Sequence, residues 1–466
     1  MAKVEEVPKR SNLWLDQKSG VSISGKLFDP ITSVFFIVLA VFSFIVFWPI
    51  VSVIEFKAAF AAPAVPFLIN IFKTFGLQGE DTSRIIFVFA FMAATAGIYL
   101  FVRDLIFRQV TPIFAALLYI IPPVPLFVLS FLSRGLNLVE LASAESFLSV
   151  IYGQLDSFLA LSLIPFAAIF FLRFLKNGSS VKFTAGTVIA AVIFLTNQSQ
   201  SLSLILVLSV LTVTELFLGQ ARLKLRRFLQ FLAVGGLLCA FWYLPIFLSR
   251  PQVILASPFF SNLKYLFPLP FIVGTLSLLF SFVVFGRRED RQGIFASFLL
   301  FIVFFSLTAD WLINGRTYAA HPNRLISDLM MFSAMVLALS ISMFFDKLNL
   351  VKYLNFENWP TAGKILGTIT FGLFSFLVIL IGSILVSPLA IKFVSGPYGI
   401  WIRVKSALIL DRDANIGAGE NFRLISQVPL NWQLYAGIAI SLGVLVILIF
   451  NLLKNLSLDE DTDNGS

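Results

Sequence analysis

About twelve long apolar stretches run through the 466-residue sequence and are separated by short polar segments. In hydrocarbon each stretch must satisfy its own backbone hydrogen bonds, which favours helices, and roughly 20 residues cross the bilayer core. The composition agrees, because 58% of the residues are hydrophobic and only 13% are charged. A water-soluble chain could not bury so much apolar surface. The sequence therefore predicts an all-α, polytopic transmembrane bundle of about twelve helices.

These helices make up a transmembrane domain over residues 31–454. The third stretch contains Pro122 and Pro123, so its helix is expected to break there. A further helix is expected within 56–75, lying on the membrane surface in the first external loop. The predicted spans are 31–54, 85–102, 110–132, 155–175, 183–196, 202–218, 228–249, 268–285, 294–308, 325–345, 365–389 and 434–453.

Lys and Arg residues gather in alternate connections, which sets the predicted topology. Arg222, Lys224, Arg226 and Arg227 share one short turn. Short loops rich in Lys and Arg stay in the cytoplasm, so we expect a multi-pass protein of the cytoplasmic membrane with both termini inside. Residues 1–30 are then a cytoplasmic segment and 455–466 a disordered acidic cytoplasmic tail. The external loops are 55–84 and 390–433.

Composition also excludes several kinds of function. The net charge of +9 is explained by the positive-inside bias and by anionic headgroups, without nucleic acid. The single cysteine, Cys239, permits no intrachain disulfide, and the single histidine, His321, excludes multi-histidine metal sites. The sequence has no phosphate-binding Walker loop, dinucleotide fingerprint, zinc spacing or nucleophile elbow. ATP-driven transport and soluble-type redox chemistry therefore have no support.

A succession of short motifs follows one order along the chain. The motifs are Pro66-Phe67-Leu68, Phe75-Gly76-Leu77, Ala96-Gly97-Ile98-Tyr99-Leu100-Phe101-Val102-Arg103, Ala115-Ala116-Leu117-Leu118-Tyr119-Ile120-Ile121-Pro122, Tyr152-Gly153-Gln154-Leu155-Asp156, Ile164-Pro165-Phe166, Trp242-Tyr243-Leu244-Pro245 and Pro322-Asn323-Arg324-Leu325. This succession resembles the integral-membrane families of the glycosyltransferase C-type (GT-C) superfamily. That superfamily includes bacterial and archaeal members labelled 6-pyruvoyl-tetrahydropterin-synthase-related, a label that implies no pterin chemistry here.

The resemblance implies a GT-C-like helical fold whose first external loop forms part of an outward-facing site. It implies transfer of a sugar from a polyprenyl-phosphate donor, with an acidic residue near the end of the first span as base or metal ligand. Only Glu55 occupies the place of the usual acidic pair. Where many relatives have a histidine at the start of a helix, this chain reads Thr196-Asn197-Gln198.

Two carboxylates are the candidate catalytic residues and the candidate metal ligands. Glu55 directly follows an apolar run, where partial desolvation favours a general base. Asp156 begins the fourth span, where a carboxylate is costly unless it faces protein, water or a partner. Either residue could bind a divalent cation such as Mg²⁺ or Mn²⁺. The alternatives are an interfacial charge for Glu55 and a helix-capping role for Asp156.

A cluster of ionisable residues at 310–328 is the candidate phosphate-binding site. Arg316 and Arg324 can hold phosphate oxygens, and His321 could carry a proton. Asp328 lies four residues after Arg324, so the two could instead form a structural ion pair.

These residues predict a glycosyltransferase that uses a polyprenyl-phosphate sugar at the outer face of the membrane. One alternative is a transporter of lipid-linked sugars or other small molecules, in which Glu215 is a candidate ion-coupling residue or a charge that reaches the interface beside Arg222. Another is a catalytically inactive scaffold that binds a protein partner through loop 390–433.

Overall fold

The computed structural model describes residues 59–60, 62–77, 79–106, 111–120, 155–217, 220–249, 265, 274, 289–314, 324–347, 423–424 and 432–463. The predicted spans 31–54 and 365–389 lie outside these residues, as do 268–285 apart from Gly274 and the part of 110–132 that follows Ile120.

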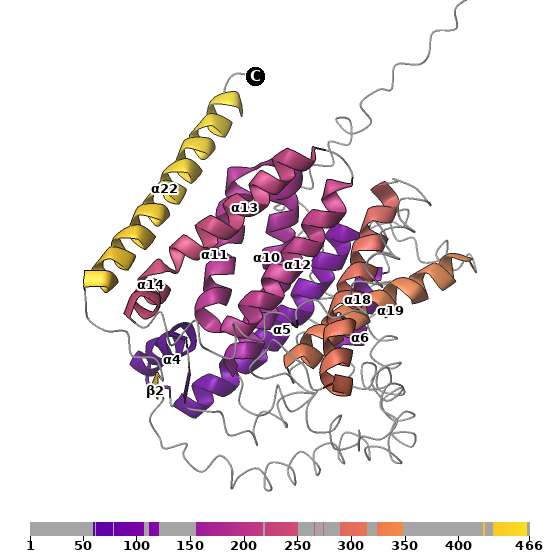
Figure 1. Cartoon of the computed structure of the whole chain (residues 1–466), viewed down its shortest axis with the longest axis horizontal. Coiled ribbons are helices and arrows are strands. Elements are labelled where there is room, and N and C mark those ends of the chain that lie inside the picture. The colour runs from indigo at the N-terminus through magenta and orange to yellow at the C-terminus, as the bar shows by residue number, and fades with distance from the viewer. Residues whose placement is uncertain are drawn as a thin grey trace, which may run out of the picture.

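The described part of the chain is helical, apart from two strands of two residues each (Figure 1). The all-α prediction is confirmed for this part, while the count of twelve helices and the GT-C type of fold stay predictions. The helices are α4 (Ala64–Thr74), α5 (Gly79–Leu105), α6 (Thr111–Ile120), α10 (Leu155–Asn177), α11 (Ser180–Thr196), α12 (Gln198–Leu216), α13 (Ala221–Leu238), α14 (Ala240–Ser249), α18 (Glu289–Asn314), α19 (Arg324–Lys347) and α22 (Trp432–Asp463).

Several of these helices could span a membrane, as the apolar stretches predicted. Four contain a segment that is long and apolar enough: Asp81–Leu105, Leu155–Asn177, Gln198–Leu216 and Trp432–Leu453. The pair α13 and α14 forms a fifth candidate if it is counted as one span. The described residues are therefore consistent with a multi-pass membrane protein.

The stretch 228–249 was expected to be one helix, and this expectation is wrong. The helix axis turns by 78° between α13 and α14. The turn follows the pair Gly235 and Gly236, and the amide of Cys239 donates to the carbonyl of Gly236 across 3.0 Å. Paired glycines are a common cause of sharp helix kinks, because they restrain the backbone least.

Helices with alternating direction give the bundle two chemically different ends. We call one the basic end; it holds the end of α12 and the start of α13, with Glu215 and Lys224. The other is the far end, where α10 and α12 begin with Asp156 and Asn197. In Figure 1 the far end is the lower one, with α4 and β2, and α22 runs upward from it.

One contact joins the predicted external segments 55–84 and 390–433. Strand β1 (Ala59–Phe60) of the first pairs in parallel with β2 (Arg423–Leu424) of the second, at the far end. Helix α4 was predicted in the first of these loops, and it packs against α5, with Val65 and Ile69 buried. Its Phe67 is 65% exposed. An apolar side chain exposed beside buried ones is typical of a helix at a membrane surface.

Small residues let the helices approach closely, as membrane bundles require in the absence of a hydrophobic force between helices in lipid. A Cβ on Gly97 of α5 would lie 2.9 Å from the ring of Phe166 and 3.1 Å from Pro165, both in α10. These three residues belong to two of the motifs quoted for the family resemblance. Aromatic rings also stack between neighbouring helices. Phe87 of α5 stacks on Phe158 of α10, and Phe304 of α18 stacks on Phe332 of α19, with 4.8 Å between the ring centres in each pair.

Helix α22 is largely exposed and contacts the bundle beside the bend between α13 and α14. The hydroxyl of Ser441 donates to the carbonyl of Leu237 and accepts from the amide of Phe241. A Cβ on Gly437 would lie 2.6 Å from the carbonyl oxygen of Ala240. At its other end α22 continues through Asp463, over most of the segment 455–466 that was expected to be disordered.

Candidate functional site at the far end

The first turns of α10 and α12 bring together Asp156 and Asn197. The Nδ2 of Asn197 donates to Oδ2 of Asp156 across 2.7 Å. Asn197 lies between α11 and α12, and its Oδ1 accepts from the amides of Ser199 and Gln200 at 3.0 and 3.1 Å. An asparagine at this position satisfies amides that begin a helix. The cap therefore fixes the amide group that holds the carboxylate of Asp156.

Gln200 extends this polar group into the bundle. Its Nε2 donates to the hydroxyl of Ser157 across 3.3 Å, and both side chains are buried. Its Oε1 is buried without a hydrogen-bond partner, which is costly for an amide oxygen. The contact between Gln200 and Ser157 therefore ties the first turns of α12 and α10 together inside the bundle.

A third polar contact joins α12 to α19. The hydroxyl of Ser203 donates to Oδ2 of Asp328 across 2.6 Å, and Asp328 is 1% exposed. Tyr119 of α6 lies close enough to Asp328 for an electrostatic interaction. Along α12, Asn197 and Ser203 are six residues apart, or about 9 Å along the helix axis. The start of α19, at Arg324, is thus at the far end of the bundle, as is Asp156.

The structure brings together only part of the predicted site. Asp156 begins a helix at the far end as predicted, and α19 begins with Arg324. Glu55, Arg316 and His321 lie outside the described residues, as does the side chain of Arg324. The phosphate-binding role of these residues and the pairing of Arg324 with Asp328 therefore stay predictions.

A divalent cation would need more ligands than the described residues supply. In this part of the chain no three His, Cys, Asp or Glu residues lie close enough to bind one metal ion. Carboxylate oxygens are ligands of the type that Mg²⁺ and Mn²⁺ prefer. Asp156 offers one carboxylate, and Glu55 would have to provide the second.

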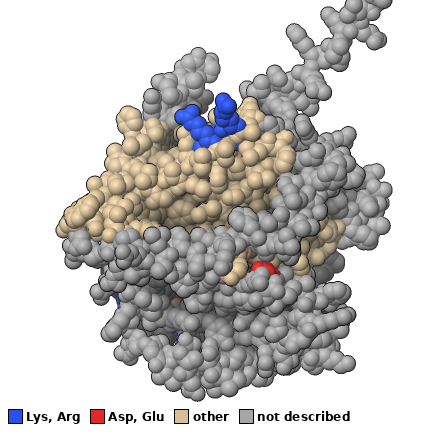
Figure 2. Space-filling model, in the orientation of Figure 1, with Lys and Arg blue, Asp and Glu red and all other residues tan. Residues whose placement is uncertain are grey.

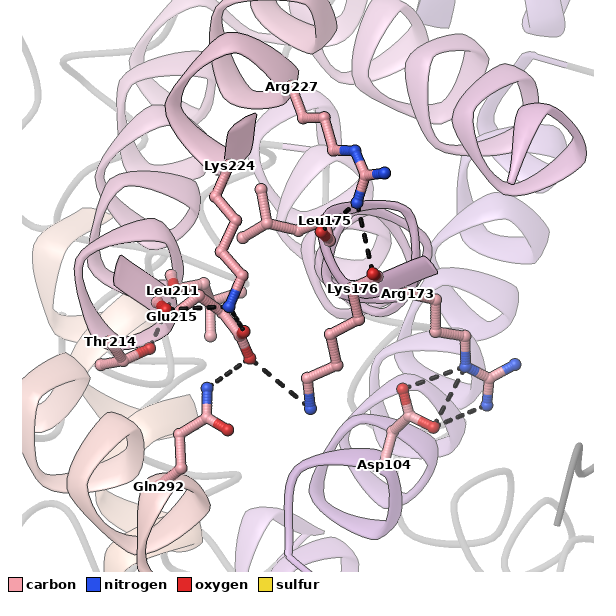
Figure 3. Close-up of polar contacts among 10 residues, drawn as sticks. All are labelled: Asp104, Arg173, Leu175, Lys176, Leu211, Thr214, Glu215, Lys224, Arg227 and Gln292. Atoms are coloured by element: carbon pink, nitrogen blue, oxygen red, sulfur yellow. Dashed lines mark hydrogen bonds and ion pairs between the residues drawn. The ribbon is translucent and has the colours of Figure 1, made fainter. Parts of the chain in front are cut away.

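The basic end holds a second polar network that the sequence did not predict (Figure 3). Nζ of Lys224 lies 2.8 Å from Oε2 of Glu215 and donates to the backbone carbonyl of the same residue at 2.9 Å. Nζ of Lys176 lies 3.5 Å from Oε1, to which Gln292 also donates. Glu215 is 1% exposed, so it does not reach the interface beside Arg222 as one hypothesis held.

Three further contacts lie at this end. The guanidinium of Arg173 binds the carboxylate of Asp104 through two nitrogens, the closest pair of atoms being 2.7 Å apart. Arg227 donates to the carbonyl of Leu175 at 2.7 Å, in the last turn of α10. Gly293 of α18 lies directly against the carbonyl of Leu105, leaving no room for a Cβ. Glu215 and Lys224 are nine residues apart, but Lys176 and Gln292 lie 39 and 77 residues from Glu215, so only the packing of the helices brings them to it.

No protein-family model matches the chain, and neither a curated protein nor a solved structure is detectably similar to it.

Proposed function

We propose that the chain is a membrane glycosyltransferase that moves a sugar from a polyprenyl-phosphate donor to an acceptor at the far end of the bundle. The observation that supports this most is the hydrogen bond from Asn197 to Asp156. It leaves Asp156 partly exposed and oriented, as a base that takes the proton of an acceptor hydroxyl must be. Arg324, Arg316 and His321 would hold the departing phosphate, and Glu55 would complete the site.

The position of α19 also supports this assignment. Its first residue, Arg324, is one helical turn before Asp328, which α12 binds through Ser203. A cation at a helix start near Asp156 would place phosphate binding and proton removal at the same end of the bundle. Strand β1, which begins four residues after Glu55, lies at that end too and pairs with β2, which supports a position for Glu55 nearby.

The test is donor consumption in membranes that contain the protein. Polyprenyl-phosphate mannose and polyprenyl-phosphate glucose are supplied separately, and the release of polyprenyl phosphate is measured by chromatography. Asp156→Asn should lower the rate by about 100-fold or more, the typical contribution of a general base. Asp81→Asn removes an exposed carboxylate from the start of α5 and should leave the rate unchanged. Equal rates in Asp156→Asn and the unaltered protein would remove Asp156 from the mechanism.

A transporter is the second candidate, favoured by the 78° break between α13 and α14 and by the buried pair of Glu215 and Lys224. Broken helices and buried ionisable residues are common in secondary transporters. Liposomes that move the lipid-linked sugar between leaflets without forming a glycosidic bond would support transport over transfer. If Glu215→Gln left that movement intact, Glu215 would have no coupling role.

A further inference from the structure

Four cationic residues crowd the first two turns of α13, and the structure separates them into two pairs. Lys224 and Arg227 turn toward the bundle, where Lys224 binds Glu215 and Arg227 binds the carbonyl of Leu175. Both are therefore occupied by contacts within the chain. Arg222 and Arg226 lie on the other side of the helix, one turn apart, and are exposed.

Exposed leucines accompany the outward pair. Leu223, Leu225 and Leu229 are 42%, 47% and 57% exposed. In water such a row of apolar side chains would be unfavourable, whereas at a membrane surface they can contact acyl chains while the arginines reach the headgroups. Figure 2 shows Lys and Arg side chains standing at the upper end of a broad surface of other residues, at the basic end of the bundle.

We propose that the outward face of α13, comprising Arg222, Leu223, Leu225, Arg226 and Leu229, binds the headgroup of an anionic phospholipid. The planar guanidinium groups of Arg222 and Arg226 can each donate two hydrogen bonds to phosphate oxygens. Their spacing of four residues, about 6 Å along the helix axis, allows both to bind the same headgroup or adjacent ones. This surface lies at the opposite end of the molecule from Asp156 and does not depend on the proposed function.

The acidic end of α22 is the competing occupant of this face. Asp459, Glu460, Asp461 and Asp463 follow the apolar part of α22, whose end lies at the same end of the molecule as the start of α13 (Figure 1). Carboxylates would satisfy Arg222 and Arg226, but they would leave the three leucines uncovered. A phospholipid supplies both a phosphate and acyl chains, and for this reason we favour it.

The experiment titrates the purified full-length chain, in a neutral detergent, with phosphatidylglycerol or phosphatidylcholine and counts bound lipids by native mass spectrometry. Arg222→Gln/Arg226→Gln should weaken phosphatidylglycerol binding by about 30-fold, since each cation near an anionic surface contributes about 1 kcal/mol. Binding of phosphatidylcholine should not change. The control, Lys73→Gln/Arg84→Gln, removes the same charge at the far end and should bind phosphatidylglycerol normally.

Three results would overturn the proposal. The first is equal phosphatidylglycerol binding by the unaltered chain and the Arg222→Gln/Arg226→Gln variant. The second is equal affinity of the unaltered chain for the two lipids. The third is displacement of the lipid by millimolar inorganic phosphate.

A variant in which the four acidic residues of α22 become amides tests whether α22, and not a lipid, occupies this face. Its lipid affinity should stay unchanged, and a large increase would show that α22 covers the face. If the glutamine variant fails to fold, Arg222→Lys/Arg226→Lys keeps the charge and should lose only the forked hydrogen bonds, with a smaller loss of affinity.

Discussion

Asn197 donates to Asp156 across 2.7 Å while its own Oδ1 accepts from two amides of α12. One side chain thus joins the end of α11, the start of α12 and the first turn of α10. Replacing it should affect both stability and the orientation of Asp156.

Asn197→Ala removes a helix cap and a hydrogen bond to a carboxylate. We expect the free energy of unfolding to fall by about 2 kcal/mol, of which about 1 kcal/mol is the cap. The measurement is unfolding in mixed detergent micelles followed by circular dichroism. Ser179→Ala is the matched control, because Ser179 precedes α11 without a side-chain capping bond. Equal losses for the two variants would contradict the structural role of Asn197.

Glu215→Gln leaves Lys224 charged in a buried position. We expect a loss of about 3 kcal/mol or more in the free energy of unfolding, the cost of breaking a buried ion pair. The double variant Glu215→Gln/Lys224→Met should recover most of it, because the remaining cation, Lys176, has a side chain that is 36% exposed and can be solvated. Thermal unfolding of the unaltered chain, Glu215→Gln, Lys224→Met and the double variant gives the coupling energy between Glu215 and Lys224.

An exposed ion pair provides the reference for this cycle. Asp81 and Arg84 are 3.2 Å apart, and the Asp81 side chain is 55% exposed. Asp81→Asn should cost less than about 0.5 kcal/mol, as is usual for surface pairs. If Asp81→Asn and Glu215→Gln lower the free energy of unfolding equally, the buried contacts of Glu215 would contribute no more to stability than an exposed ion pair.

Gly437→Ala should displace α22 from the bend between α13 and α14. The added methyl group would meet the carbonyl oxygen of Ala240 at 2.6 Å, and the two hydrogen bonds of Ser441 would be strained with it. We expect a loss of about 1–3 kcal/mol, typical of overpacking. Gly443→Ala meets nothing within 4 Å and should be neutral or slightly stabilising. Differential scanning fluorimetry in detergent compares the two.

The orientation of the bundle can be tested with single cysteines. The only native cysteine, Cys239, is buried and should not react with a membrane-impermeant maleimide. Phe75→Cys at the far end should be labelled in intact cells, because residue 75 is 78% exposed there. Arg222→Cys at the basic end should be labelled only after the membrane is opened. The reverse pattern would invert the predicted topology.

The sequence predicted the helices well where apolar residues run without interruption. The stretch 155–175 became α10, and 183–196 became α11, within a few residues at each end. Hydrophobicity alone could not predict the bend at Cys239, because Gly235 and Gly236 are also compatible with a straight membrane helix.

The polar contacts were harder to predict, since they join residues far apart in the chain. Asp156 was recognisable as a carboxylate at a helix start, but its partner Asn197 is 41 residues later. Glu215 was noticed as a charge in an apolar helix, yet Lys224 and Lys176 reach it only because the α12–α13 hairpin lies against the end of α10. Charge patterning reports the side of the membrane, whereas pairing depends on how helices pack.

The contact of Gly293 with the backbone of Leu105 limits how the molecule can move. At that point α5 and α18 touch without an intervening side chain, next to Gln292, which donates to Glu215. Such a junction can pivot but cannot widen without losing its packing. We therefore expect α5 and α18 to separate more readily at the Asp156 end than at this contact.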